Sequence, residues 1–358
     1  MKDQNKMNFS IAGRLVGDDQ SPYIIAELSG NHNGQIGRAF QLIEAAHKAG
    51  ADAVKIQTYT ADTITMKSDR PEFIVRGGLW DGRTLYELYQ EAHTPWEWHQ
   101  ALFAKAREIG ITIFSSPFDF TAVDFLEGLN APAYKIASFE NNDLPLIQRV
   151  ARTGKPIIIS TGMADDTGIA EAVAAARGAG CRALCLLHCI SGYPTPASAS
   201  NLRTLQDISA RFGTVTGLSD HTLTTSTAVV AVALGAKVIE KHMTLARADG
   251  GLDASFSLEP HEFKRLVDDC RTAHESLGHI KYTQADCEKP NIIFRRSLYI
   301  VSDVKAGEKL TMENVRSIRP GYGMLPKELP KVLGKTAARD IVRGTPMSWD
   351  LVVENSTK

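Results

Sequence analysis

Short runs of apolar residues recur along most of the chain, and most of them are continuous rather than alternating. Strands that are buried on both faces, as in a parallel sheet, have this pattern. Helix-like segments lie between the runs, and four of these segments end in glycine just before the next run, where a left-handed residue closes a helix. Eight strands are therefore expected, over residues 23–28, 53–58, 111–117, 133–138, 156–161, 183–189, 215–221 and 238–244.

The spacing of these strands predicts the fold class. Their first residues lie mostly 22 to 32 positions apart, the length of a βα unit, and the one step of 58 residues leaves room for an extra loop and helix. Eight βα units predict an α/β fold, a (β/α)8 or TIM barrel. An open doubly wound sheet is the alternative, but no GxGxxG turn follows the first strand.

The chain after the last expected strand divides into a helix, a linker and a second domain. Residues 259–278 have the pattern of the last barrel helix, so we expect the barrel domain to span residues 1–280. Residues 281–290 are expected as a linker. Residues 291–358, rich in strand and turn signals, are expected to form a small β-rich domain.

Composition narrows the classes of partner and the compartment. Among 358 residues the formal net charge is −1, which gives no field that would favour nucleic acid or a membrane surface. The five cysteines lack Cys-x-x-Cys spacing, which disfavours a disulfide framework or a structural zinc site. No apolar run approaches the ~20 residues that span a bilayer, and the first residues have no apolar signal core. We therefore expect a soluble, cytoplasmic protein.

Polar side chains gather where the expected strands end. In a (β/α)8 barrel these ends and the loops that follow them build the active site. Burying charges there costs several kcal/mol unless they are paired or bind something, so the pattern predicts a functional site. The residues concerned are Glu27, Lys55, Gln57, Ser116, Lys135, Ser138, Glu140, Ser160, Ser191, Tyr193, Ser219, His221, Glu240 and His242.

Two histidines occupy equivalent places on adjacent expected strands. His221 and His242 lie 21 positions apart, about one βα repeat, and neighbouring strands are ~4.8 Å apart. Two imidazoles at that spacing can share one divalent metal, with waters or carboxylates completing the coordination. The alternative is a pair of hydrogen-bonded core histidines; the matched positions favour a metal site.

Lys55 and Lys135 each lie inside an apolar strand, where a lysine needs an anion or must lose its proton. Together with serine hydroxyls they could hold a doubly anionic ligand. One lysine could instead form a Schiff base with a carbonyl, or internal ion pairs with Glu27 or Glu240 could neutralise both. Two lysines and several hydroxyls fit a doubly anionic ligand better than a Schiff base. Trp80, by contrast, is interpreted as a packing residue.

These motifs resemble the sialic-acid synthase family, whose members condense phosphoenolpyruvate with an N-acetylated sugar. The resemblance covers roughly residues 9 to 353, and residues 291–358 are similar to the family's antifreeze-like (SAF) domain. RTLYELYQEAHTPWEW, HMTLARADGGLDASFSLEP and RSIRPGYG are similar to the pseudaminate branch of the family. The family motifs, in the family's order, are IAELSGNHNG, AVKIQTYTADT, FSSPFD, YKIASFE, IISTGM, LLHCISGYPTP, GLSDHTL and IEKHMTL.

The resemblance implies roles for individual residues. His221 and His242 would hold a divalent metal, usually manganese, with magnesium or cobalt as alternatives. The other residues would bind the two substrates: Lys55, Lys135, Ser138 and Ser219 the phosphoenolpyruvate, with Ser116 nearby, and Glu27, Gln57, Tyr193 and Asp253 the sugar or the reacting centre. Arg319 would reach the sugar's N-acyl group from the partner subunit of a domain-swapped homodimer.

Two departures bear on the sugar. Ser191 stands where neuraminate synthases have asparagine, and Gly250-Gly251 replaces their proline-glycine turn. Both argue against N-acetylmannosamine as the substrate.

The implied reaction joins phosphoenolpyruvate to the open-chain aldehyde of 2,4-diacetamido-2,4,6-trideoxy-altropyranose. Water is consumed, with Glu27 or Glu140 as the base, and pseudaminic acid and phosphate form by C–O cleavage. N-acetylneuraminate and legionaminate synthases are alternatives within the family. More remote alternatives are a metal-independent Schiff-base aldolase and a sugar-binding or scaffold protein without activity.

Overall fold

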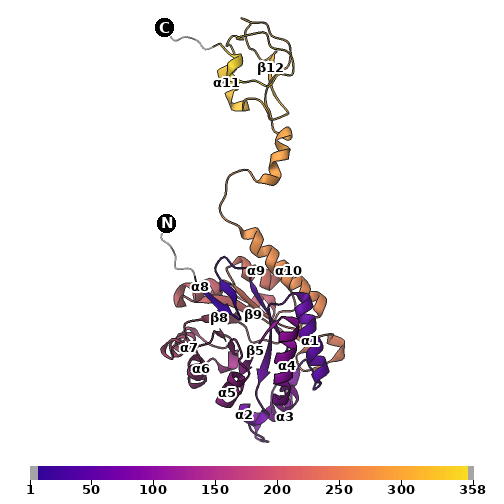
Figure 1. Cartoon of the computed structure of the whole chain (residues 1–358), viewed down its shortest axis with the longest axis vertical. Coiled ribbons are helices and arrows are strands. Elements are labelled where there is room, and N and C mark those ends of the chain that lie inside the picture. Colours follow the sequence, from indigo (N-terminus) through magenta and orange to yellow (C-terminus); the bar gives the residue numbers. More distant parts are fainter. Residues whose placement is uncertain (1–6, 354–358) are drawn as a thin grey trace. The chain divides into compact units, whose positions relative to one another are not determined.

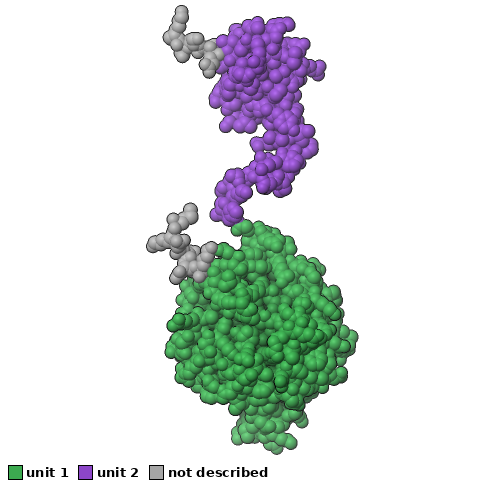
Figure 2. Space-filling view, viewed as in Figure 1, with its two compact units in different colours: residues 1–278 green, residues 279–358 purple. Residues whose placement is uncertain are grey.

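The computed structural model describes residues 7–353 (Figure 1). The chain forms two compact units, residues 1–278 and residues 279–358 (Figure 2). Each unit has its own hydrophobic core.

The first unit is a closed barrel of eight parallel strands, which confirms the predicted fold class. Each strand is hydrogen-bonded to its neighbours in the order β10-β3-β4-β5-β6-β7-β8-β9. Every strand is almost entirely buried, as the continuous apolar runs predicted. The strands are β3 (Tyr23–Glu27), β4 (Ala53–Thr58), β5 (Thr112–Pro117), β6 (Tyr134–Ile136), β7 (Ile157–Ser160), β8 (Leu184–Cys189), β9 (Val215–Asp220) and β10 (Val238–His242).

Helices cover the outside of the barrel, and their apolar faces pack on the outward side chains of the strands. The long step between β4 and β5 contains the expected loop and two extra helices, one more helix than the sequence predicted. The helices are α1 (Ile36–Ala49), α2 (Ala61–Ile64), α3 (Leu85–Ala92), α4 (Trp96–Ile109), α5 (Phe120–Gly128), α6 (Leu144–Ala151), α7 (Asp166–Gly178), α8 (Thr204–Phe212), α9 (Ser226–Ala233) and α10 (Pro260–Leu277).

An N-terminal hairpin, which the sequence did not predict, closes one end of the barrel. Its antiparallel strands are β1 (Asn8–Ile11) and β2 (Arg14–Gly17). Phe9, Ile11 and Val16 pack in one cluster with the apolar residues of the barrel interior. The amino-terminal half of the interior is therefore filled by apolar side chains, which leaves the carboxyl-terminal end for polar groups.

The second unit is small and contains an antiparallel strand pair, β11 (Ser297–Ile300) and β12 (Val315–Ile318), and one short helix, α11 (Leu329–Val332). Part of the segment expected as a linker belongs to a 3-10 helix, Asp286–Phe294.

Over residues 7–353, no helix is both long and apolar enough to cross a membrane.

Candidate active site

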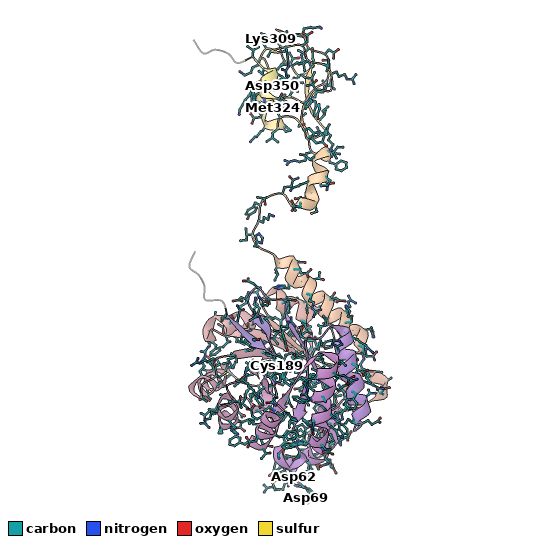
Figure 3. All side chains as sticks on the ribbon, viewed as in Figure 1. Asp62, Asp69, Cys189, Lys309, Met324 and Asp350 are labelled. Carbon is teal, nitrogen blue, oxygen red and sulfur yellow. The ribbon has the colours of Figure 1, made fainter. Side chains whose placement is uncertain are left out.

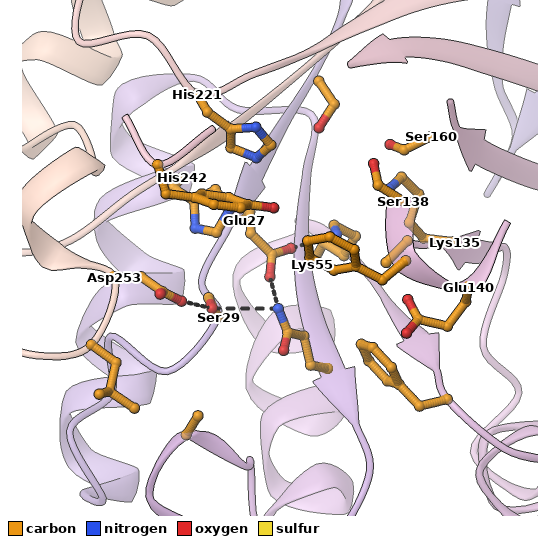
Figure 4. A pocket seen from close by; sticks show the side chains of 18 of the residues that line it. Glu27, Ser29, Lys55, Lys135, Ser138, Glu140, Ser160, His221, His242 and Asp253 are labelled. Atoms are coloured by element: carbon orange, nitrogen blue, oxygen red, sulfur yellow. Dashed lines mark hydrogen bonds and ion pairs between the residues drawn. The ribbon is translucent and has the colours of Figure 1, made fainter. Parts of the chain in front are cut away.

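A pocket opens at the carboxyl-terminal ends of the barrel strands, where the polar residues were predicted to gather (Figure 4). The pocket has an empty volume of about 960 Å³, which includes space that is open to solvent. In Figure 3, Asp62 and Asp69 mark the outer end of the loop that follows β4, whereas Cys189 lies within the body of the unit. The predicted residues that line the pocket are Glu27, Lys55, Gln57, Lys135, Ser138, Glu140, Ser160, Tyr193, Ser219, His221, Glu240, His242 and Asp253.

Four buried charges form the floor of this pocket. Lys55 Nζ lies 2.8 Å from Glu27 Oε2 and 3.3 Å from Glu240 Oε1. Lys135 Nζ lies 3.5 Å from the same Glu240 oxygen. The four side chains are between 1% and 4% exposed. In the absence of a ligand the two lysines are therefore balanced by two carboxylates, which is the internal ion pairing that the sequence left open.

The two lysines of this cluster differ in their electrostatics. Burial lowers the pKa of both, but at Lys55 the attraction of Glu240 and Glu27 outweighs burial and raises the pKa above its usual value. At Lys135 burial prevails over Glu240, and the repulsion of Lys55 lowers the pKa further. An anion beside Lys135 would stabilise its protonated form, so this lysine is the better placed to gain from a ligand.

Serine hydroxyls gather at one corner of the pocket. Ser160 Oγ has no hydrogen-bond partner within the described part of the chain, and the Ser191 side chain interacts with Tyr193. A Cβ added at Gly162 would lie 2.3 Å from Ser191 Oγ and 2.6 Å from Ser138 Oγ, so glycine keeps this corner open. Buried hydroxyls without partners are costly unless something binds them. The corner formed by these groups is suited to an anion.

Ser116 and Ser219 lie against the ion cluster itself. Lys55 Nζ donates to Ser116 Oγ at 3.4 Å, and Ser219 Oγ donates to Glu240 Oε1 at 3.3 Å. Ser116 does not line the pocket, so it contacts Lys55 rather than the open space.

The two histidines meet as their spacing predicted. Their ring centroids are 5.3 Å apart. His221 Nδ1 lies 3.1 Å from the Ile190 carbonyl, which can only accept, so this nitrogen carries the proton and leaves Nε2 with a free lone pair. Burial, with the repulsion of His221, lowers the pKa of His242 well below its usual value and keeps it neutral.

This pair fits a divalent metal by the chemistry of its donors. His242 Nδ1 is buried and has no hydrogen-bond partner among the described residues. No group of three or more His, Cys, Asp or Glu side chains within residues 7–353 is arranged around a metal position. An ion at the two imidazoles would therefore take its other ligands from water and substrate, which is typical of a catalytic rather than a structural site.

A chain of polar side chains continues from the ion cluster on the side of His242. Gln57 Nε2 donates to Glu27 Oε1 at 2.9 Å and to Ser29 Oγ at 3.3 Å, and Ser29 Oγ in turn donates to Asp253 Oδ2. Burial raises the pKa of Asp253 to about 6, although the bond from Ser29 opposes this. Figure 4 shows Asp253 and Ser29 across the pocket from Lys135.

Glu140 faces the pocket from the opposite side, on the 3-10 turn Ser138–Glu140 after β6. Burial raises the pKa of its carboxyl to about 7, and the charge of Lys135 only partly opposes this. Its Oε2 atom has no hydrogen-bond partner in the described structure. A carboxyl that titrates near neutrality can both accept and return a proton at physiological pH.

Aromatic rings form one wall of the pocket. The Tyr193 ring lies 4.5 Å from that of His221 and 5.1 Å from that of Phe256. Trp80, interpreted from sequence as a packing residue, lines the pocket 6.0 Å from Tyr193. That interpretation was incomplete, because a hydrogen bond from Trp80 Nε1 to the Leu252 carbonyl holds the ring at the pocket. Trp96, by contrast, stacks on a helix side chain outside the pocket.

The sequence and the fold of the chain are similar to those of known proteins. A sequence model of the NeuB family matches residues 42–282, and one of the SAF domain matches residues 295–353. The chain belongs to the NeuB family. It is 45% identical to a protein from Campylobacter jejuni named pseudaminic acid synthase, over 91% of this chain and 95% of that one. A protein of the same name from Helicobacter pylori is 41% identical over 92% of this chain and 98% of that one.

Solved structures of relatives have the same architecture. The spore coat polysaccharide biosynthesis protein spsE of Bacillus subtilis is 33% identical, covers 98% of this chain and 100% of its own, and has a TM-score of 0.66. An N-acetylneuraminic acid (sialic acid) synthetase from Leptospira borgpetersenii is 28% identical, covers 82% of this chain and 98% of its own, and has a TM-score of 0.72. The predicted barrel with a C-terminal SAF domain is thus confirmed.

Three predicted site residues of this NeuB-family chain do not line the pocket of the barrel unit: Ser116, which contacts Lys55, and also Ser191 and Arg319. Ser191 lies beside Ser138 next to Gly162. Arg319 belongs to the second unit, directly after β12. Its predicted contact with a sugar stays a prediction.

The sequence did not identify several residues that the structure brings to this site. Ser29 follows the end of β3, so a closer reading of strand ends would have found it. The other residues lie on loops or on the outer face of a strand, where the hydrophobic pattern of the sequence does not distinguish them. They are Tyr59, Trp80, Leu252, Phe256 and Lys241.

Lys241 holds the two histidines in place from behind. Its ammonium is fully buried and donates to Asp220 Oδ2 at 2.7 Å and to the Thr222 carbonyl at 2.5 Å. His221 lies between those two residues, and His242 directly follows Lys241. One lysine therefore joins the loop that carries the first histidine to the strand that carries the second.

We predict that Lys241→Met destabilises the barrel strongly. It leaves the Asp220 carboxylate buried without its partner, which costs ~3–5 kcal/mol of unfolding free energy. Lys237→Met is the matched control, because Lys237 pairs with Asp18 at the surface, with side chains 24% and 35% exposed, and such pairs contribute ~0–1 kcal/mol. Urea denaturation of the full chain, followed by circular dichroism, measures both. Equal effects of the two substitutions would contradict the role of Lys241.

Proposed function

We propose that this protein is a pseudaminic acid synthase that uses phosphoenolpyruvate. The observation that carries the proposal is that one pocket is lined by a buried lysine pair, a buried histidine pair and the carboxyl of Glu140, whose pKa is about 7. The choice of sugar rests on the 41–45% identity to proteins named pseudaminic acid synthase, against 34% for a legionaminic acid synthase of Legionella pneumophila.

The lysine side of the pocket would bind phosphoenolpyruvate. Its phosphate and carboxylate are two anionic groups, and Lys55 and Lys135 are two cations at one site. The Ser160 hydroxyl, which has no partner among the described residues, and the Ser138 hydroxyl would donate to the phosphate oxygens. The opposite side, with Gln57 and Asp253, would orient the open-chain sugar.

Divalent metal, manganese or alternatively magnesium or cobalt, would be held by His221 and His242 and would supply Lewis-acid polarisation of the sugar's aldehyde oxygen. The double-bond electrons of phosphoenolpyruvate would form a bond from its methylene carbon to the aldehyde carbon, which leaves positive charge at C2. The C=O π electrons would move to the aldehyde oxygen, which becomes a hydroxyl by taking up one proton of the water that adds at C2. Glu27, buried beside this centre, would stabilise the positive charge at C2.

Water then adds at C2, and its proton passes to a carboxylate, for which Glu140 is well suited because its pKa is about 7. The resulting intermediate loses phosphate by cleavage of the C2–O bond. Throughout these steps Lys55 and Lys135 would hold the anionic groups.

A Schiff-base aldolase is the second candidate, and the two lysines differ as nucleophiles. The pKa of Lys55 is raised by its carboxylate neighbours, which keeps the amine protonated. Lys135 has a lowered pKa and is the one suited to this chemistry. Borohydride trapping of a carbonyl substrate on Lys135 would favour the aldolase.

The partner subunit and the compartment stay predictions. We propose a homodimer in which Arg319 serves the partner's pocket, and a cytoplasmic site of action, on the resemblance alone.

We predict that chelator-treated protein releases no phosphate from phosphoenolpyruvate and that manganese restores release with the bis-acetamido sugar of the pseudaminate pathway. N-acetylmannosamine is the comparison substrate and is expected to be inert. Release with N-acetylmannosamine alone would retain the reaction but refute the choice of sugar. Release that persists after complete metal removal would refute a metal role for His221 and His242.

We further predict a pH limb from Glu140. A base must be ionised, so kcat/KM for the sugar should rise as pH increases through about 7, and a bound anion nearby would move this limb upward. Glu140→Gln should flatten the limb and lower the rate ~10²-fold or more. Glu171→Gln, at an exposed position of α7, is the control and should keep the wild-type profile. An unaltered profile in Glu140→Gln would exclude this carboxyl as the base.

A further inference from the structure

Trp80 sits at the tip of a hairpin-like loop that is fixed by its own hydrogen bonds. Ile74 and Thr84 form an antiparallel bridge, and the amide of Val75 donates to the Arg83 carbonyl at 2.8 Å. The Gly82 amide donates back to the Val75 carbonyl at 2.9 Å. Trp80 therefore lies on a turn whose two sides are joined by backbone hydrogen bonds.

The indole of Trp80 is oriented by a contact that is distant in sequence. Its Nε1 donates to the Leu252 carbonyl at 3.2 Å. Because this is the ring's one donor, the part left to face the pocket is apolar. Leu252 follows Gly251, whose backbone approaches Asn33 so closely that an added Cβ would lie 2.4 Å from Oδ1. The acceptor is therefore held on a constrained loop.

Trp80 lies on the side of the pocket away from Lys135. It touches the residue before Asp253 and neighbours Tyr193, and Figure 4 shows Asp253 across the pocket from Lys135. In the proposed reaction the aldehyde carbon must meet phosphoenolpyruvate near the lysines and the two histidines. The end of the sugar distal to the aldehyde then points to the side of Trp80 and Leu252.

We propose that Trp80 and Leu252 form an apolar subsite for the methyl group at the aldehyde-distal end of a 6-deoxy sugar. The inference rests on the proposed function and adds a determinant of specificity to it. An indole face and a leucine side chain offer a hydroxyl no partner, so a 6-hydroxy sugar loses its hydration there without compensation. Apolar pockets discriminate against one added hydroxyl by about 10- to 100-fold, and wild type should prefer the 6-deoxy sugar by that factor in kcat/KM.

The test compares a 2,4-diacetamido sugar with its 6-hydroxy congener in wild type, Trp80→Ala, Trp80→Gln and Leu79→Ala. In Trp80→Ala, the kcat/KM for the 6-deoxy sugar divided by that for the 6-hydroxy sugar should fall to within about 3-fold of unity. In Trp80→Gln, the amide can bond to the hydroxyl, so the enzyme should prefer the 6-hydroxy sugar. KM for phosphoenolpyruvate should stay unchanged in both. Leu79, the exposed neighbour of Trp80 outside the pocket lining, is the matched control, and Leu79→Ala should keep the wild-type ratio.

The outcomes separate this inference from the proposed function. A wild-type enzyme that turns over the 6-deoxy sugar, with an unchanged ratio in Trp80→Ala and Trp80→Gln, would overturn the role of Trp80 alone. If one of these variants does not fold, the ratio in the other decides. No turnover of either sugar by wild type would instead overturn the proposed function.

Discussion

The balance of four buried charges at the end of the barrel is the constraint on which the site depends. Lys55, Lys135, Glu27 and Glu240 are nearly inaccessible to water. The free energy needed to remove such charges from water usually exceeds the free energy gained from their mutual attraction. A buried cluster of this kind is therefore not expected to stabilise the fold by itself. Its arrangement favours a different purpose. Glu240 is shared by both lysines through one oxygen, so an incoming anion could replace part of this attraction without rebuilding the site.

The alternation of side chains along β10 joins this cluster to the histidine pair. Glu240 and His242 line the pocket, whereas Lys241 between them points to the other face and reaches the loop around His221. Because successive residues of a strand face opposite sides, β10 directs Glu240 toward the two lysines and His242 toward His221, while Lys241 braces the strand from its other face. The apolar hairpin at the other end of the barrel excludes water from beneath and keeps the dielectric low.

The sequence predicted the barrel and most of the pocket because both follow from local patterns. A continuous apolar run ending in a polar residue marks both a barrel strand and its active-site end, as at Glu27 and His242. Trp80 could not be found in this way, because its contact with Leu252 spans 172 residues and depends on loop geometry. The N-terminal hairpin was missed since its strands are only four residues long, too short for a periodic pattern. The proposed contact of Arg319 with a partner's pocket would depend on assembly, which no local pattern encodes.

The most direct test of the account is the affinity of phosphoenolpyruvate for the metal-free protein, measured by isothermal titration calorimetry in wild type and in Lys135→Met. Lys155→Met is the control, since Lys155 pairs with Glu127 on the outside of the barrel, where the two side chains are 26% and 36% exposed. If the buried cluster is an anion site, Lys135→Met should raise Kd by ~30-fold or more, as expected for loss of a buried charge partner, and the control should leave Kd unchanged. An unchanged Kd in a folded Lys135→Met protein would mean that the lysines only neutralise their own carboxylates, and the account would fail.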